Sequence, residues 1–139
     1  MKTGLLIRLA LLAALFVGVT STAHATTGLE MLKLCNQAVK MMDGPKGKFD
    51  PIMMAEANYC IGAVEATMAM LALHKDLMTP ERAVCVPRIS LSQASRLAVK
   101  FMENRPDILH MSSGALLYLA FRDSYPCPAN GEPADSAGQ

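Results

Sequence analysis

Apolar residues recur at intervals of three and four positions along most of the chain, the spacing of one face of an α-helix. The pattern predicts an all-α protein, and no segment competes seriously as a β-strand. A short fifth helical turn is expected near residues 107–110. The four longer helices are expected at Gly28 to about Met42, Pro51 to about His74, about Leu91 to about Glu103, and about Ser113 to about Ser124.

Local signals support these helix boundaries. Thr27-Gly28-Leu29-Glu30 and Ser90-Leu91-Ser92-Gln93 both have the form of a capping box, in which side chains satisfy the first backbone N–H groups. Asp43-Gly44-Pro45 ends the first helix, since Gly44 can adopt the left-handed conformation and Pro45 cannot continue a helix. Asp50-Pro51 restarts the chain, with Asp50 as the cap and Pro51 at the first helical position.

The second predicted helix is apolar almost all round. One face is apolar at three-to-four spacing, and a second face is small and partly polar. A helix with so little solvated surface is usually buried in its domain or shared with a partner. A membrane span is the alternative, but Glu56, Asn58 and Glu65 interrupt the apolar run. The first face holds Met53, Ala57, Cys60, Val64, Thr67 and Leu71, and the second holds Asn58, Gly62, Glu65, Ala69 and Ala72.

The start of the chain has the three parts of a secretory signal. Lys2 and Arg8 form a basic beginning, residues 9–19 are almost wholly apolar, and Ala23-His24-Ala25 has the form of a cleavage site. The apolar run is shorter than the ~20 residues that a membrane-spanning helix needs. We therefore expect a signal peptide over residues 1–25, a helical domain over 26–127, a disordered tail over 128–139, and export to the periplasm.

The net charge of the chain argues against some classes of binding partner. The whole chain has 13 basic and 12 acidic residues, and loss of the signal removes Lys2 and Arg8. The mature chain then has 11 basic residues against 12 acidic ones, a net charge of −1. A charge so near zero argues against a nucleic-acid partner and against a membrane-surface partner after cleavage.

The four cysteines all follow the predicted cleavage site. An even set in an exported chain is typical of a disulfide framework, although four cysteines allow three pairings. If the first two helices form an antiparallel hairpin, Cys35 and Cys60 come to about the same height above its loop. A second antiparallel hairpin brings Cys85, before the third helix, close to Cys127, after the fourth. The predicted fold is therefore two helical hairpins with two disulfides.

Enzymatic and metal chemistry receive little support. The cysteines are too widely spaced for a typical zinc site, and a cysteine nucleophile would find only His74 or His110 as a base. Glu56 and Glu65 would lie on opposite faces of their helix, which is a poor arrangement for paired carboxylates. Methionine can bind copper(I), but at helical spacing it more often fills a core. The sequence predicts a binding protein without a cofactor.

Several short motifs, in this order, resemble a known family. The segments are Tyr59-Cys60-Ile61-Gly62, Cys85-Val86-Pro87, Ser90-Leu91-Ser92-Gln93, Val99-Lys100-Phe101-Met102 with Arg105-Pro106, and Ala120-Phe121 with Tyr125-Pro126-Cys127.

This set resembles the Tai/Rap family of periplasmic immunity proteins, which protect bacteria from peptidoglycan amidases delivered by type VI secretion. The resemblance implies a small helical, disulfide-bonded domain that often dimerises and that blocks the amidase at or over its active cleft. Two segments depart from the family pattern. Ala63-Val64-Glu65-Ala66 stands where an aromatic residue and a glycine are common, and Leu109-His110-Met111-Ser112-Ser113 lacks a frequent proline.

Two functions follow from these observations. The first is a binding inhibitor of a peptidoglycan amidase, not itself an enzyme, with contacts from the loops 43–49 and 77–88. Lys46, Lys48 and Arg88 would pair with acidic groups of the amidase, and Phe49 would be an apolar anchor. The alternative is a periplasmic chaperone or stress-protection protein. A homodimer is a further expectation, taken from the resemblance.

Overall fold

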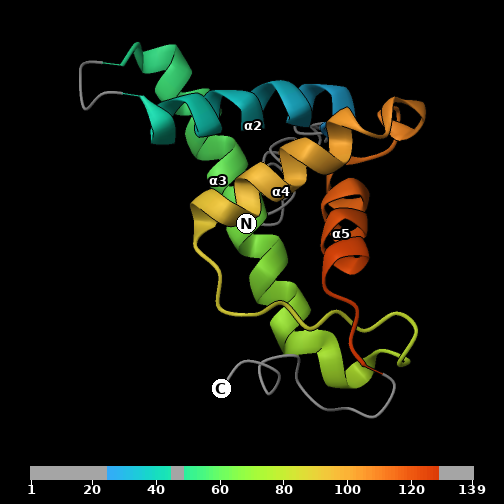
Figure 1. The fold of residues 1–139 in the computed structure, drawn as a ribbon. Coiled ribbons are helices and arrows are strands. Elements are labelled where there is room, and N and C mark those ends of the chain that lie inside the picture. The colour runs from blue at the N-terminus through green and yellow to red at the C-terminus, as the bar shows by residue number, and fades with distance from the viewer. Residues whose placement is uncertain (1–24, 45–48, 129–139) are drawn as a thin grey trace, which may run out of the picture.

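The computed structural model describes residues 25–44 and 49–128 (Figure 1). The predicted signal peptide and tail therefore lie outside the described residues, apart from Ala25 and Pro128. The all-α fold is confirmed, and within the described ranges the only β-type pairs are two isolated bridges. The elements are α2 (Gly28–Asp43), α3 (Pro51–His74), η1 (Lys75–Leu77), α4 (Leu91–Glu103), η2 (Pro106–Ile108) and α5 (Ser113–Ser124).

The helices begin where the capping signals predict. The Thr27 hydroxyl accepts a hydrogen bond from the Glu30 N–H, and the Glu30 carboxylate accepts one from the Thr27 N–H at 2.8 Å. Ser90 and Gln93 form the same reciprocal pair at the start of α4. The Asp50 carboxylate accepts the Ile52 N–H at 2.7 Å. Each start is thus determined by residues within one helical turn.

The end of α2 corrects one expectation. Gly44 does not adopt the left-handed conformation but has an extended backbone, with φ −74° and ψ 161°. The residue before a proline is disfavoured in helical conformations, so Pro45 accounts for this geometry. A Cβ atom at position 44 would lie 2.9 Å from the Lys40 carbonyl oxygen, so the glycine permits a close approach.

The four long helices cross one another around a single core. Figure 1 shows α2 lying across the upper part of α3, with α4 below α2 and α5 on the right. α2 packs against α3 and α4, and α4 packs against α5. The largest fully buried side chains are Phe121, Met31, Met102, Leu116, Leu117, Val64 and Val84.

Two disulfides join the helices, and their pairing is the predicted one. Cys35 bonds to Cys60, with both residues fully buried where α2 crosses α3. Cys85 bonds to Cys127 and joins the segment before α4 to the segment after α5. The loop-entropy model attributes about 3–4 kcal/mol of stabilisation to loops of this length. The two consecutive helical pairs are therefore each closed covalently.

The residues that follow the predicted cleavage site are hydrogen-bonded to the turn before α5. The Thr26 carbonyl accepts the Ser113 N–H at 2.8 Å, and the Gly28 and Leu29 N–H groups donate to the carbonyls of Met111 and Leu109. These hydrogen bonds tie the first described residues to the turn before α5. The chain is therefore held in the fold from Thr26 onward.

Candidate protein-binding surfaces

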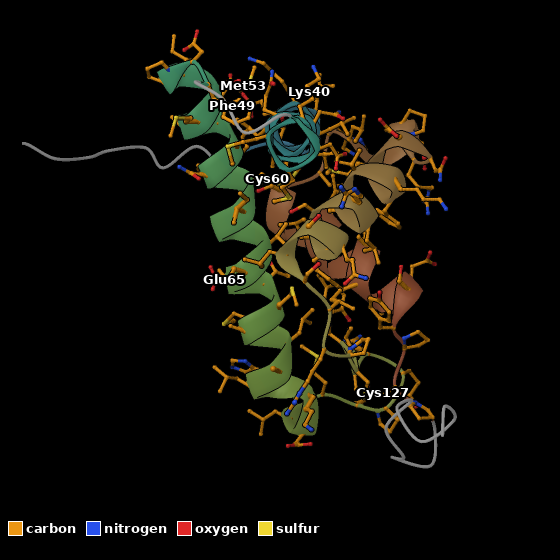
Figure 2. All side chains as sticks on the ribbon, turned by 60° about the vertical axis from the view of Figure 1, so that its left-hand side comes forward. Lys40, Phe49, Met53, Cys60, Glu65 and Cys127 are labelled. Atoms are coloured by element: carbon orange, nitrogen blue, oxygen red, sulfur yellow. A yellow bond between two sulfur atoms is a disulfide. The ribbon has the colours of Figure 1, made fainter. Side chains whose placement is uncertain are left out.

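The predicted contact residues occupy separate parts of the fold. Lys46 and Lys48 lie outside the described residues. Phe49 is half-buried, and its ring packs towards Gly44 at the end of α2. Figure 2 shows Phe49 at the end of α3 where Met53 lies. Arg88 is exposed on the segment that enters α4.

The two predicted contact loops adjoin opposite ends of α3. The first loop precedes Pro51 and the second follows His74, so each joins α3 at a different end. A helix of 24 residues is about 36 Å long. A single small contact area therefore cannot include both helix ends.

The cysteines and His74, which were considered for chemistry, have structural partners. All four cysteines are in disulfides, and within residues 25–44 and 49–128 no three His, Cys, Asp or Glu side chains are grouped to hold a metal. His74 Nδ1 lies 2.9 Å from the Met70 carbonyl oxygen at the end of α3. In the same ranges no helix is both long and apolar enough to span a bilayer.

The segment from Leu77 to Arg88 is held firmly although it contains no long helix. The Arg82 and Ala83 N–H groups both donate to the Thr79 carbonyl, which forms a tight turn. The Cys85 N–H donates to Tyr125, the Cys127 N–H donates to Ala83, and the disulfide joins the same two strips of chain. The Tyr118 hydroxyl adds a hydrogen bond to the Arg82 carbonyl at 3.0 Å. We call residues 77–88 the braced loop.

An apolar hollow lies beside the braced loop, between α3 and α5. Its volume is about 380 Å³, and most of its wall is apolar. A second hollow of about 580 Å³ adjoins it, because both are lined by Met78 and Tyr118. Arg82 and Arg122 line the second hollow, and the Arg122 guanidinium lies 5.7 Å from the Tyr118 ring centre. The pair of hollows suits an apolar side chain followed by a carboxylate.

The sequence predicted only part of this site. The braced loop coincides with a loop predicted to make contacts, and Leu77 at its start is 81% exposed. The hollow residues Met70, Tyr118 and Arg122 were not predicted. They come from α3 and α5, and no local motif marks residues that only the fold brings together.

A third hollow of about 480 Å³ lies between α4 and α5, and its wall includes three basic side chains and the acidic Asp123. Its positive charge is largely compensated within the protein. Arg96 forms an ion pair with Asp43, and Arg105 forms one with Asp107 at 3.2 Å. The hydrogen bond from Arg105 lowers the pKa of Asp107. This hollow is therefore a weaker candidate for an acidic partner.

Residues 27–127 match the family of Rap1a immunity proteins. The chain belongs to this family. No curated protein and no solved structure matches the chain. The Rap1a match begins at Thr27, the capping residue of α2, and ends at Cys127, the last cysteine. It therefore covers the whole disulfide-bonded domain.

Membership of the Rap1a family identifies the general role of these surfaces. It indicates an immunity protein directed against a secreted effector, so the partner is an effector protein. The Rap1a family is not an enzyme family, and its members are typically exported. The expected resemblance to Tai/Rap immunity proteins is confirmed.

The outward side of α3 is a further exposed surface of this Rap1a domain. Residues that recur at alternating intervals of three and four form a stripe that we call the α3 seam. Its large members are strongly exposed, with Ile52 at 70%, Tyr59 at 50% and Leu73 at 74%. Figure 2 shows α3 along one side of the molecule, with Glu65 directed away from the other helices. The seam consists of Ile52, Ala55, Tyr59, Gly62, Ala66, Ala69 and Leu73, all exposed.

Proposed function

We propose that this protein is a periplasmic immunity protein that binds and inhibits a peptidoglycan amidase delivered by type VI secretion. The observation that carries the proposal is the Rap1a match over the whole domain, from the first helix cap to the last cysteine. The order of motifs that resembles the Tai/Rap family supplies the amidase as the target. The same match favours immunity over the chaperone alternative.

Export to the periplasm is supported by two independent features. The first 25 residues have the basic, apolar and cleavage-site parts of a signal peptide, and Thr26, the residue after the predicted cleavage site, is hydrogen-bonded into the fold. Both disulfides require an oxidising compartment in order to persist. Such a compartment is also where an amidase meets peptidoglycan.

The braced loop is the proposed inhibitory element. A loop that is already ordered loses little conformational entropy on binding, so more of the contact energy appears as affinity. Leu77 would insert as the apolar anchor, and the hollow beside it would accept an apolar side chain of the amidase. Arg82 and Arg122 would pair with a carboxylate of the amidase. Inhibition would then require only that the bound loop cover the active-site cleft of the amidase.

The residues predicted from the sequence would add contacts at the edge of this interface. Arg88 lies at the end of the braced loop and is exposed. Lys46, Lys48 and Phe49, beyond the opposite end of α3, would contribute through a wide interface or through a second protein copy. Charged residues at an interface rim mainly raise the association rate and add specificity. We also propose that the protein forms a homodimer.

The proposal is tested by expressing candidate amidases, encoded beside this chain's gene, in the periplasm with and without the protein. We expect lysis with the amidase alone, no lysis with the protein, and a complex on gel filtration. An amidase with its catalytic cysteine replaced is the control, because it should bind without causing lysis. Lysis in the presence of the protein, together with no complex, would reject inhibition of that amidase.

A further inference from the structure

Three side chains that can donate electron pairs to a metal ion line the apolar hollow between α3 and α5. Met70 and His74 are four residues apart on α3, so their Cβ atoms lie on one face of the helix, about 5–6 Å apart. Met78 follows the 3₁₀ turn η1 and lines the same hollow from the braced loop. Two thioether sulfurs and one imidazole thus surround a single space of about 380 Å³.

A hydrogen bond of His74 determines which of its ring nitrogens is available to a metal ion. The Nδ1 atom lies 2.9 Å from the Met70 carbonyl oxygen, which can only accept, so Nδ1 carries the proton and donates it. In the neutral imidazole the Nε2 atom then has a free lone pair. Metal-binding histidines have this same arrangement, in which the second ring nitrogen donates to a carbonyl or carboxylate and the ring is thereby oriented.

Packing in the core does not account for these methionines. Methionine at helical spacing usually fills gaps in a core, but Met70 is 56% exposed. Met78 and His74 are half-buried at the wall of the hollow. The donor atoms are therefore within reach of a small solute from the solvent.

The set of donor atoms favours a soft, monovalent metal ion. Thioether sulfur selects copper(I), and imidazole also suits copper. Among the described residues no carboxylate lines the hollow, so calcium and magnesium would lack the oxygen ligands that they require. Arg82 and Arg122 line the adjoining hollow, and their charges repel a divalent ion twice as strongly as a monovalent one.

We propose that Met70, His74 and Met78 form a binding site for copper(I), with the two thioether sulfurs and the His74 Nε2 atom as ligands. Methionine has three rotatable side-chain bonds, so both sulfurs can adjust to the ion without a movement of the backbone. The hydrogen bond from the Tyr118 hydroxyl to the Arg82 carbonyl holds the braced loop, which contains Met78, beside α5. Copper(I) binding by the free protein requires no amidase.

The first test locates the ion by NMR of the methionine methyl groups. The mature protein, with both disulfides formed, is titrated in the absence of oxygen with copper(I) supplied as its acetonitrile complex. Copper(I) is diamagnetic, so the signals of its ligands shift without paramagnetic broadening. We expect the Met70 and Met78 methyl signals to shift together and to saturate at one ion per chain. The signal of Met54, near the opposite end of α3, should not move, and zinc(II) should shift none of the three.

The second test measures the affinity for copper(I) by isothermal titration under the same conditions. Met70→Leu, His74→Gln and Met78→Leu should each weaken binding by about tenfold or more, because loss of an outer-shell partner alone typically costs that much. Leucine replaces methionine at nearly constant volume and lacks the sulfur, so the fold should be retained. Circular dichroism checks that the variants keep the helix content of the wild type.

Met54→Leu and His110→Gln are the matched controls. Both residues are exposed and neither lines the hollow, so both variants should bind copper(I) as the wild type does. The proposal is overturned if the two methyl signals do not shift, if the three hollow variants keep the wild-type affinity, or if the controls lose as much as they do. Equal affinity for zinc(II) would overturn the preference for a soft monovalent ion. All measurements use the free protein, so their outcome is independent of amidase inhibition.

Discussion

Gly28 and Leu116 are in such close contact that a Cβ atom on the glycine would lie 2.0 Å from the leucine Cδ1. The same atom would lie 2.9 Å from the Leu109 carbonyl oxygen. The first turn of α2 therefore rests directly on α5 and on the turn that precedes it. This contact anchors the beginning of the domain to its last helix.

Gly28→Ala should destabilise the protein, since the added methyl group must displace Leu116 or the backbone at Leu109. Overpacking of this kind costs about 1–3 kcal/mol, and thermal denaturation would measure the loss. Gly114→Ala is the control because a Cβ atom there has open space. It should be neutral or slightly stabilising. Equal losses in the two variants would contradict the close contact.

Ser95→Ala should stabilise the protein. Ser95 is fully buried in α4, and its hydroxyl oxygen has no hydrogen-bond partner among the described residues. Alanine removes the unsatisfied group and is the better helix former, so a gain of about 1 kcal/mol is expected. Ser90→Ala should instead lower the free energy of unfolding by about 1 kcal/mol, because Ser90 caps the start of α4. Chemical denaturation of both variants measures the difference.

The two disulfides should respond differently to a mild reductant. Cys85 and Cys127 are half-buried, whereas Cys35 and Cys60 are fully buried. Access for the attacking thiolate therefore favours reduction of Cys85–Cys127 first. Alkylation followed by peptide mass spectrometry should label these two cysteines before the others. Simultaneous labelling of all four would indicate that reduction requires global unfolding.

Reduction of Cys85–Cys127 alone should release the braced loop and leave α2 and α3 joined. We expect helix content to persist in circular dichroism while the affinity for the amidase falls. Unchanged affinity after selective reduction would show that the disulfide does not pre-order the binding element.

Leu77→Asp should weaken amidase binding by about tenfold or more, because it replaces an exposed apolar anchor with a charge. Leu29→Asp is the matched control: Leu29 is 64% exposed in the first turn of α2, where a carboxylate favours the helix. Isothermal titration with the amidase compares the two variants. An equal effect, or none in either, would exclude Leu77 as an anchor.

The helix boundaries could be predicted because their causes are local. The pairs Thr27–Glu30 and Ser90–Gln93 lie within one turn of each other, so their hydrogen bonds depend little on the rest of the chain. Gly44 was predicted less well. The general preference of glycine for left-handed helix ends was overridden by the proline that follows it.

The predicted contact residues stay a prediction. Arg88 and Phe49 both lie in or beside loops, and the fold leaves Arg88 exposed while Phe49 packs towards Gly44 at the end of α2. Arg96 and Arg105 have carboxylate partners in the fold, Asp43 and Asp107, and no local motif marks the pairing of Arg96 with Asp43.

The sequence by itself determined where α2, α3 and α4 begin and which cysteines pair, because caps act within one turn and a hairpin aligns residues at equal distances from its loop. Only the tertiary structure decided that α3 is buried on one side and open on the other. It also formed the apolar hollow between α3 and α5 and placed carboxylate partners beside Arg96 and Arg105. These features depend on contacts between residues far apart in the chain, and the relative orientation of the helices determines which side chains meet.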